Sequence, residues 1–164
     1  MIKKEVHFTV DVFSSIEELQ PADIGLLSAA RETTKEAYAP YSKFLVGAVA
    51  QLTNGAIVKG TNQENAAYPV GLCAERVLLS SIASQFPCIA IQTIAISYHN
   101  LTGESNHPIS PCGICRQSLA EYEQRVNQPT RIILSGMSGE VYIIDKAADL
   151  LPLSFSASDL ASGR

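Results

Sequence analysis

The sequence lacks an excess of basic residues and carries little charge of either sign. Lysine and arginine number 12 against 16 aspartates and glutamates, so the formal net charge is −4, and charged residues make up 17% of the chain. Nucleic-acid-binding surfaces usually need clustered lysine and arginine, and the pair Lys3-Lys4 is too small to form such a cluster. We therefore expect no nucleic-acid partner.

Long apolar runs, internal repeats and low-complexity segments are also missing. One uncharged stretch, 77–103, is long enough to span a bilayer, but serines, glutamines and Pro87 interrupt it. At the start, Lys3, Lys4 and Glu5 are followed by mixed polar and apolar residues, which is unlike a secretory signal. We expect no membrane partner and a cytoplasmic location. The 164 residues suit one domain with a single core.

What the sequence does contain is an alternation of helical and strand patterns. Apolar residues at helical spacing predict a first helix, which Pro40 ends. The dipeptide Asn54-Gly55 tolerates positive φ and predicts a hairpin between two strands. The predicted elements are, in order, helix 21–38, strands 44–52 and 56–61, helix 73–86, strand 89–98, helix 112–126, strands 131–134 and 141–144, and short closing helices.

This order predicts an α/β fold. A hairpin followed by strands on helical crossovers gives a mixed sheet between helices, so we expect a three-layer α/β/α sandwich with five strands. Residues 1–20 alternate only weakly in polarity. We expect them to form an N-terminal arm or an added edge strand, next to a single domain over 21–164.

Four cysteines are present, and three of them are placed to bind one metal ion. Cys112 and Cys115 are three positions apart at a predicted helix start, so their sulfurs share one face. Cys73, at the start of the preceding helix, offers a third thiol. Three protein ligands leave a fourth tetrahedral position for water, as in catalytic zinc sites. Cys88 adjoins Pro87 at the entrance to an apolar strand, and we expect it to be a buried small residue.

Two charged residues, Glu75 and Arg76, lie close after Cys73 at the start of the predicted helix. Glu75 and Cys73 can both face a metal if the helix points its N-terminus at the ion, because side chains lean that way. A carboxylate beside the zinc can accept a proton from bound water and deliver it to a substrate. Arg76 would offset part of the negative charge that three thiolates create around a divalent cation.

The motifs around these cysteines resemble the cytidine deaminase family. The resemblance covers roughly 26–160 and preserves the order of the family's landmarks. The matching segments are Tyr41-Ser42-Lys43-Phe44 with Val46-Gly47-Ala48, Asn62-Gln63-Glu64-Asn65-Ala66-Ala67-Tyr68-Pro69, Cys73-Ala74-Glu75-Arg76, Pro111-Cys112-Gly113-Ile114-Cys115-Arg116-Gln117, and Leu150-Leu151-Pro152 with Ser154-Phe155. Gln63 departs from the family pattern, where an apolar residue is more usual, and so does the Ser156-Ala157-Ser158 tail.

The resemblance implies a reaction and a role for each matching residue. The reaction is hydrolytic deamination of cytidine and deoxycytidine to uridine and deoxyuridine, with release of ammonia, in pyrimidine salvage. The enzyme would be a homotetramer with one Zn²⁺ per subunit. The implied roles are zinc binding by Cys73, Cys112 and Cys115, proton transfer by Glu75, stacking on the base by Phe44, hydrogen bonding to the ribose by Asn62 and Glu64, contact with the base edge at Ala74, and reach into a neighbouring subunit by Tyr68 and Phe155.

Three other functions fit parts of the same pattern. A deaminase of a cytosine-containing antibiotic of the blasticidin type would keep the zinc and Glu75, although the segment Asn62 to Asn65 favours a nucleoside. Nucleic-acid-editing deaminases commonly have a histidine in place of Cys73, and they bind polyanions, which an acidic domain does poorly. A non-catalytic zinc module, or a Cys₄ site recruiting Cys88, explains neither the open ligand position nor Glu75.

Overall fold

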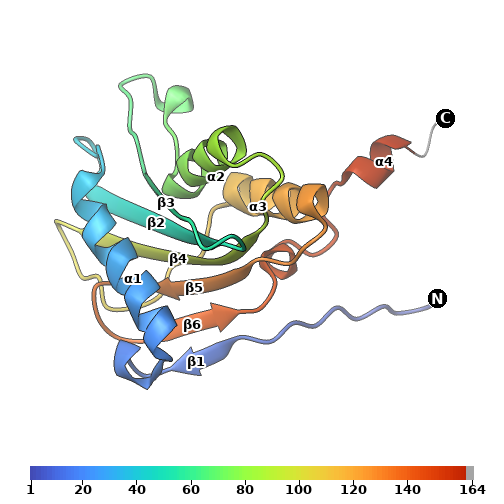
Figure 1. The fold of residues 1–164 in the computed structure, drawn as a ribbon, viewed down its shortest axis with the longest axis horizontal. Helices are drawn as coiled ribbons and strands as arrows, with labels where there is room; N and C mark the ends of the chain where they lie inside the picture. The colour runs from blue at the N-terminus through green and yellow to red at the C-terminus, as the bar shows by residue number, and fades with distance from the viewer. Residues whose placement is uncertain (162–164) are drawn as a thin grey trace.

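A mixed sheet of six strands forms the centre of the molecule (Figure 1). This computed structural model describes residues 1–161, so 162–164 of the predicted domain lie outside the described part. The strands are β1 (Asp11–Phe13), β2 (Phe44–Leu52), β3 (Ile57–Thr61), β4 (Ile91–Asn100), β5 (Arg131–Ser135) and β6 (Val141–Ile144), in the order β1-β6-β5-β4-β2-β3. Strands β4 and β5 run parallel, whereas the other neighbouring pairs are antiparallel.

The mixed α/β fold is confirmed, but the prediction of five strands is wrong. The sixth strand is β1, which pairs antiparallel with β6 and places Val12 opposite Tyr142. β1 lies inside the weakly alternating segment 1–20, for which an added edge strand was one of the two expectations, but the predicted count of five strands left it out. Its pairing depends on Phe13, which packs against the core on one face of the sheet.

Helices cover both faces of this sheet, as Figure 1 shows. Helix α1 (Pro21–Thr33) packs on one face, while α2 (Ala74–Gln85) and α3 (Gly113–Val126) pack on the other. A separate buried cluster lies beneath each layer, centred on Leu27 in one case and on Leu78 in the other. The short elements are 3-10 helices η1 (Ile16–Glu18), η2 (Thr34–Glu36), η3 (Tyr68–Val70) and η4 (Ala147–Leu150), and helix α4 (Ala157–Ala161).

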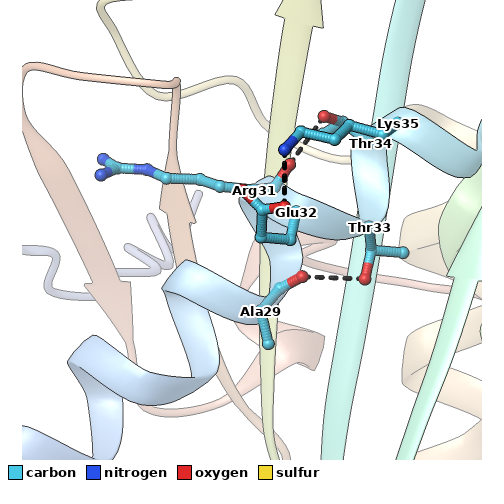
Figure 2. Close-up of polar contacts among 6 residues, drawn as sticks. All are labelled: Ala29, Arg31, Glu32, Thr33, Thr34 and Lys35. Atoms are coloured by element: carbon cyan, nitrogen blue, oxygen red, sulfur yellow. Dashed lines mark hydrogen bonds and ion pairs between the residues drawn. The ribbon is translucent and has the colours of Figure 1, made fainter.

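The first helix ends earlier than the predicted range 21–38 because threonine hydroxyls bind its last carbonyl groups (Figure 2). Thr33 donates to the carbonyl of Ala29 at 2.8 Å, and Thr34 donates to that of Arg31 at 2.7 Å. Such bonds compete with continuation of the helix. The chain therefore tightens into η2 before it enters the sheet.

Gly60 on β3 allows α2 to approach the sheet closely. A Cβ atom on Gly60 would lie 2.7 Å from the carbonyl oxygen of Ala74 and 2.5 Å from the backbone nitrogen of Leu78. Real Cβ atoms do not approach backbone atoms so closely, since packed atoms repel strongly at such separations. The absence of a side chain at this position therefore lets the first turns of α2 lie directly against β3.

Cys88 differs from its predicted environment. It was expected to be buried, and the structure places it at the surface with a left-handed φ of 67°, in the turn between α2 and β4. The strand was predicted from residue 89, whereas β4 begins at Ile91, so Cys88 lies in the turn rather than at the strand entrance. Within residues 1–161, no helix combines the length and the apolar character needed to cross a bilayer.

Candidate zinc and substrate site

Three cysteine sulfurs converge where the first turns of α2 and α3 meet. Cys73 and Cys112 are the N-cap residues of these helices, and Cys115 lies in the first turn of α3. The Sγ atoms of Cys73 and Cys112 are 3.7 Å apart, and those of Cys112 and Cys115 are 3.5 Å apart. All three ligand atoms lie within 4.8 Å of one another. A tetrahedral Zn²⁺ with bonds of about 2.3 Å separates its sulfurs by roughly 3.8 Å, so the cluster fits one zinc ion.

The local electrostatics favour thiolates in this cluster. The pKa of Cys73 is lowered to about 6, chiefly by the hydrogen bond with Cys115, while Cys112 and the positive charge of Arg76 act in the same direction. The same hydrogen bond with Cys73 raises the pKa of Cys115. One thiolate therefore forms readily near neutral pH, and the positive ends of two helix dipoles face it. Metal binding requires deprotonated thiols, so this environment assists it.

Glu75 is a buried carboxylate in the first turn of α2. Its side chain is only 6% exposed, and burial raises its pKa above the ordinary value, while a hydrogen bond to its own backbone and one with Cys115 partly oppose this. It lines the same cavity as Cys73. The N-terminus of α2 thus points at the sulfur cluster, which is the geometry that lets residues two apart face one ion.

The cavity above the cluster has a volume of about 330 Å³, which suits a small molecule. The predicted site residues Asn62, Glu64, Tyr68, Cys73, Ala74, Glu75 and Cys112 line it. It is further lined by residues that were not predicted as part of the site, namely Val46, Gln63, Gly71, Leu72, Ile96, Ile109 and Ser110. The wall is thus polar at the side of Asn62 and Glu64, and apolar along β2 and β4.

Backbone groups of β2 and of the loop that precedes it hold the side chains of Asn62 and Glu64 in place. The Asn62 amide accepts a hydrogen bond from the Val46 N–H at 2.8 Å and donates one to the Phe44 carbonyl at 2.8 Å. The Glu64 carboxylate accepts bonds from two successive backbone N–H groups, those of Tyr41 at 2.9 Å and the following serine at 3.2 Å. Both side chains are therefore oriented before any substrate arrives.

The aromatic ring of Phe44 lies against Tyr98 of β4. The two rings stack with centroids 4.8 Å apart and an interplanar angle of 10°, and Tyr98 is buried. The Tyr98 hydroxyl in turn contacts Nδ1 of His107 at 3.3 Å. Phe44 is not among the residues that line the cavity, whereas Val46, two positions along the same strand, is.

Tyr68 and Phe155 are exposed at the rim of the molecule. Tyr68 is 77% exposed in η3, lines the cavity mouth, and meets Tyr41 edge to face. Phe155 is 60% exposed and lies outside the cavity lining; its carbonyl accepts a hydrogen bond from Gln117 of α3 at 2.9 Å. Two large rings in contact with solvent are available to a second chain.

Arg76 lies beside the cluster but outside the substrate cavity. It lines a separate hollow between α2 and α3, and its charge reaches Cys73, since it contributes to the lowered pKa of that thiol. His7 and His107 are exposed and His99 is half-buried, and none of the three joins the sulfur cluster.

This geometry agrees with comparisons against known proteins. Residues 21–128 match the family model described as the cytidine and deoxycytidylate deaminase zinc-binding region. The chain belongs to this family. Among curated relatives of this deaminase family, the cytidine deaminase of Halalkalibacterium halodurans is 34% identical over 137 residues, which cover 82% of this chain and 95% of the relative.

A solved structure from the family has the same fold. The cytidine deaminase from Burkholderia pseudomallei superimposes with a TM-score of 0.69 and is 38% identical, over 80% of this chain and 97% of the other. A more distant relative, the blasticidin-S deaminase of Bacillus cereus, is 26% identical over 136 residues, or 82% of this chain and 92% of that protein. The antibiotic deaminase is thus a less similar relative than the cytidine deaminases.

The lining residues that were not predicted from the sequence fall into three groups. Gln63, Gly71 and Leu72 lie along the chain between the predicted residues Asn62 and Cys73. Ile109 and Ser110 directly precede the motif that begins at Pro111, so their closeness to Cys112 could have been inferred from the chain alone. Val46 and Ile96 lie on neighbouring strands, where β2 and β4 pair antiparallel. Nothing in the local pattern of either strand indicates that the two side chains meet at one cavity.

Proposed function

We propose that this chain is a zinc-dependent enzyme that deaminates cytidine and deoxycytidine by hydrolysis. The observation that carries the proposal is the position of Glu75, a buried carboxylate that lines one small cavity together with the thiol cluster. A structural zinc site needs neither a nearby unligated acid nor a cavity beside the metal. Membership of the deaminase family and the 34% identity with a cytidine deaminase support the same reaction.

Glu75 is proposed to move both protons of the reaction. Bound zinc supplies Lewis-acid activation that makes water a nucleophile at neutral pH. Glu75 accepts a proton from the attacking water and delivers it to N3 of the pyrimidine while the C4–O bond forms. It then transfers the proton of the new hydroxyl to the amino group, the C4–N bond breaks, and ammonia leaves.

We propose that the other side chains position the nucleoside. Asn62 and Glu64 bind the ribose hydroxyls as donor and acceptor, which their prearranged hydrogen bonds to β2 and the preceding loop support. The backbone at Ala74 contacts the base edge. Phe44 stacks on the base. Its ring now lies against Tyr98, so it has to turn away from Tyr98 towards the cavity for this contact.

We further propose a homotetramer in which neighbouring subunits complete each site. The exposed rings of Tyr68 and Phe155 support this arrangement. Arg76 is proposed to balance the charge of the zinc-bound thiolates, as its effect on Cys73 suggests. A cytoplasmic location is also proposed, because a reducing compartment keeps all four cysteines as free thiols.

A nucleoside panel monitored by ultraviolet absorbance tests the function. Purified protein with a measured zinc content is incubated with cytidine, deoxycytidine, blasticidin S and a cytosine-containing oligonucleotide. We expect loss of absorbance with the two nucleosides. Turnover of blasticidin S alone would favour the antibiotic deaminase, and a full zinc content without turnover of any substrate would favour a non-catalytic zinc module.

A further inference from the structure

The first ten residues form an extended arm that the deaminase site does not use. Residues 1–10 belong to no helix or strand, and the sheet begins at Asp11. Figure 1 shows this arm joining the start of β1 and extending from there away from the sheet to the N-terminus. The arm also precedes the region that matches the family, which begins at residue 21. Its role is therefore to be sought outside the chemistry of the family.

From residue 5 to residue 12, the arm and β1 have one apolar and one polar face, and Lys4 ends the apolar face towards the N-terminus. In an extended chain, alternate residues share a face, and the even positions Val6, Phe8, Val10 and Val12 are all apolar, whereas Glu5, His7, Thr9 and Asp11 are polar. Val10 packs against the core on the side of α2 and α3. Val6 and Phe8 continue this face outward but are 53% and 45% exposed. An apolar stripe thus leaves the core and ends in solvent.

The strand that follows the arm has a free edge. β1 is the last strand of the sheet, with β6 as its neighbour on one side. Backbone groups along such an edge readily pair with another strand, and the arm extends this edge by several residues. The arm and β1 thus combine an unpaired sheet edge with an exposed apolar stripe. These are the two features through which a partner strand binds, by backbone hydrogen bonds and by side-chain contacts.

We propose that this segment pairs antiparallel with the same segment of a second copy of the chain, about a two-fold axis at His7. In this register Lys3 lies opposite Asp11 of the second copy, and Val6 lies opposite its Phe8. Symmetry produces each of these pairs twice. Opposite charges and apolar pairs directly across an antiparallel ladder are stabilising. The segment is thus complementary to itself in charge at Lys3 and Asp11 and in polarity at Val6 and Phe8, whereas Lys4 lies opposite Val10.

The neighbouring register is less favourable. A two-fold axis at Phe8 keeps the apolar residues on one face but brings Glu5 opposite Asp11 of the second copy. Two carboxylates directly across a ladder repel each other, and this contact too would occur twice. An axis at Val6 would bring Lys4 opposite Phe8 and separate Lys3 from Asp11. We therefore place the axis at His7, and the result is one continuous sheet that runs through both copies.

Light scattering on two matched variants tests the pairing. Phe8→Lys replaces an apolar residue in the interface, whereas Thr9→Lys adds the same charge on the other face, opposite Glu5 of the second copy. If the arms join two of the proposed homotetramers, we expect the mass of the wild-type particle to be halved to that of one tetramer in Phe8→Lys and unchanged in Thr9→Lys. The deaminase activity per zinc should be preserved in both, because each tetramer stays intact. An unchanged mass in Phe8→Lys would overturn the proposal.

A cysteine scan identifies the second strand. In a Cys88→Ser background loaded with zinc, His7→Cys places two thiols opposite each other across the axis, so mild oxidation should yield a covalent dimer. Thr9→Cys lies opposite Glu5 and should not crosslink. Absence of a His7→Cys dimer, or equal crosslinking at both positions, would mean that the arm binds a different surface or a different protein, and it would reject self-pairing.

Discussion

At the residue scale, the behaviour of Glu75 depends on its exclusion from water. The side chain is 6% exposed, and burial raises its pKa. A raised pKa means that the buried carboxyl group takes up a proton more readily than an exposed glutamate does, which suits the proposed role of accepting a proton and donating it again within one turnover. The three adjacent thiols can hold one zinc ion, and Glu75 lines the same cavity as Cys73.

Replacing Glu75 by glutamine should separate metal binding from catalysis. Glu75→Gln keeps the size and burial of the side chain but cannot accept a proton, so we expect an unchanged zinc content and a fall in kcat of at least about 100-fold. The measurements are elemental analysis and the absorbance assay with cytidine. As a control, Glu32→Gln makes the same change on an exposed face of α1 and should leave both values unaltered. Ordinary turnover by Glu75→Gln would remove Glu75 from the mechanism.

At the scale of elements, the site depends on how closely α2 approaches β3. The start of α2 positions Cys73 and Glu75, and Gly60 of β3 lies directly beneath it, close to Ala74 and Leu78. Any side chain at position 60 has to push the first turn of the helix outward, because the atoms in its way are backbone.

The substitution Gly60→Ala should therefore damage the zinc site from a distance. We expect a loss of about 1–3 kcal/mol in the free energy of unfolding, together with faster loss of zinc to a chelator. The control is Gly25→Ala in α1, where a Cβ atom meets nothing within 4 Å, and where alanine should stabilise the helix by about 0.5–1 kcal/mol. Chemical denaturation and a colorimetric zinc-release assay measure both effects. Equal zinc release in the two variants would contradict this role of Gly60.

The junction after α3 depends on the buried carboxylate of Glu123. It accepts hydrogen bonds from the backbone N–H groups of Thr130 at 2.7 Å, Ala147 at 2.9 Å and Ala148 at 3.2 Å. One side chain thus links α3 to the start of β5 and to η4. Burial raises the pKa of Glu123, against the effect of these three donors and the charge of Lys146.

The stabilising effect of Glu123 should decrease as the pH rises. The pKa of Glu123 is higher in the folded than in the unfolded chain. Its contribution to the free energy of unfolding is therefore complete below the unfolded pKa of about 4.3, and it is lost as the pH rises through the folded pKa. We expect the stability difference between wild type and Glu123→Gln to shift in favour of the variant over this range. Urea unfolding at several pH values measures it, with the exposed Glu121→Gln as control. A shift in the opposite direction would mean that the backbone donors outweigh burial.

At the scale of the whole molecule, the metal connects two segments that are far apart in sequence. Cys73 starts α2, whereas Cys112 and Cys115 belong to the start of α3. Between them lies β4, a central strand of the sheet. A bound ion therefore joins two helices of one layer, and metal binding should contribute to the stability of the whole domain.

Removing zinc should lower the melting temperature. With free zinc at about 100 times its Kd, binding contributes about 2.7 kcal/mol, which in a chain of this size corresponds to roughly 5–10 °C. Scanning calorimetry before and after chelation measures the shift. Cys88→Ser should behave as the wild type, because Cys88 is exposed and outside the cluster. Cys115→Ser should have a lower melting temperature than the zinc-loaded wild type both before and after chelation. If Cys88→Ser also lost its response to chelation, the ligand set would be wrong.

Several features of this protein followed from the sequence alone because they are local. The closeness of the Cys112 and Cys115 sulfurs requires only that positions three apart share a helix face. The hairpin between β2 and β3 requires only a turn residue that tolerates positive φ, and Gly55 has a φ of 85°. The bounds of β2 and β6 were predicted correctly, since alternating or apolar runs between turn residues mark both strands. The family was evident from several short motifs in one order, and the match over 21–128 confirms it.

Other features were decided by contacts between distant segments. β1 is a sixth strand because it pairs with the edge of β6 and because Phe13 packs against the core. The orientation of Phe44 depends on Tyr98, fifty-four positions away along the chain, and the cavity brings Val46 and Ile96 together from two strands. Periodicity describes which face of an element is apolar, but it does not say what will lie against that face. Local sequence therefore indicated the candidate ligands, whereas the meeting of Cys73 with Cys112 and Cys115 and the shape of the substrate site were decided by the packing of α2 and α3 on the sheet.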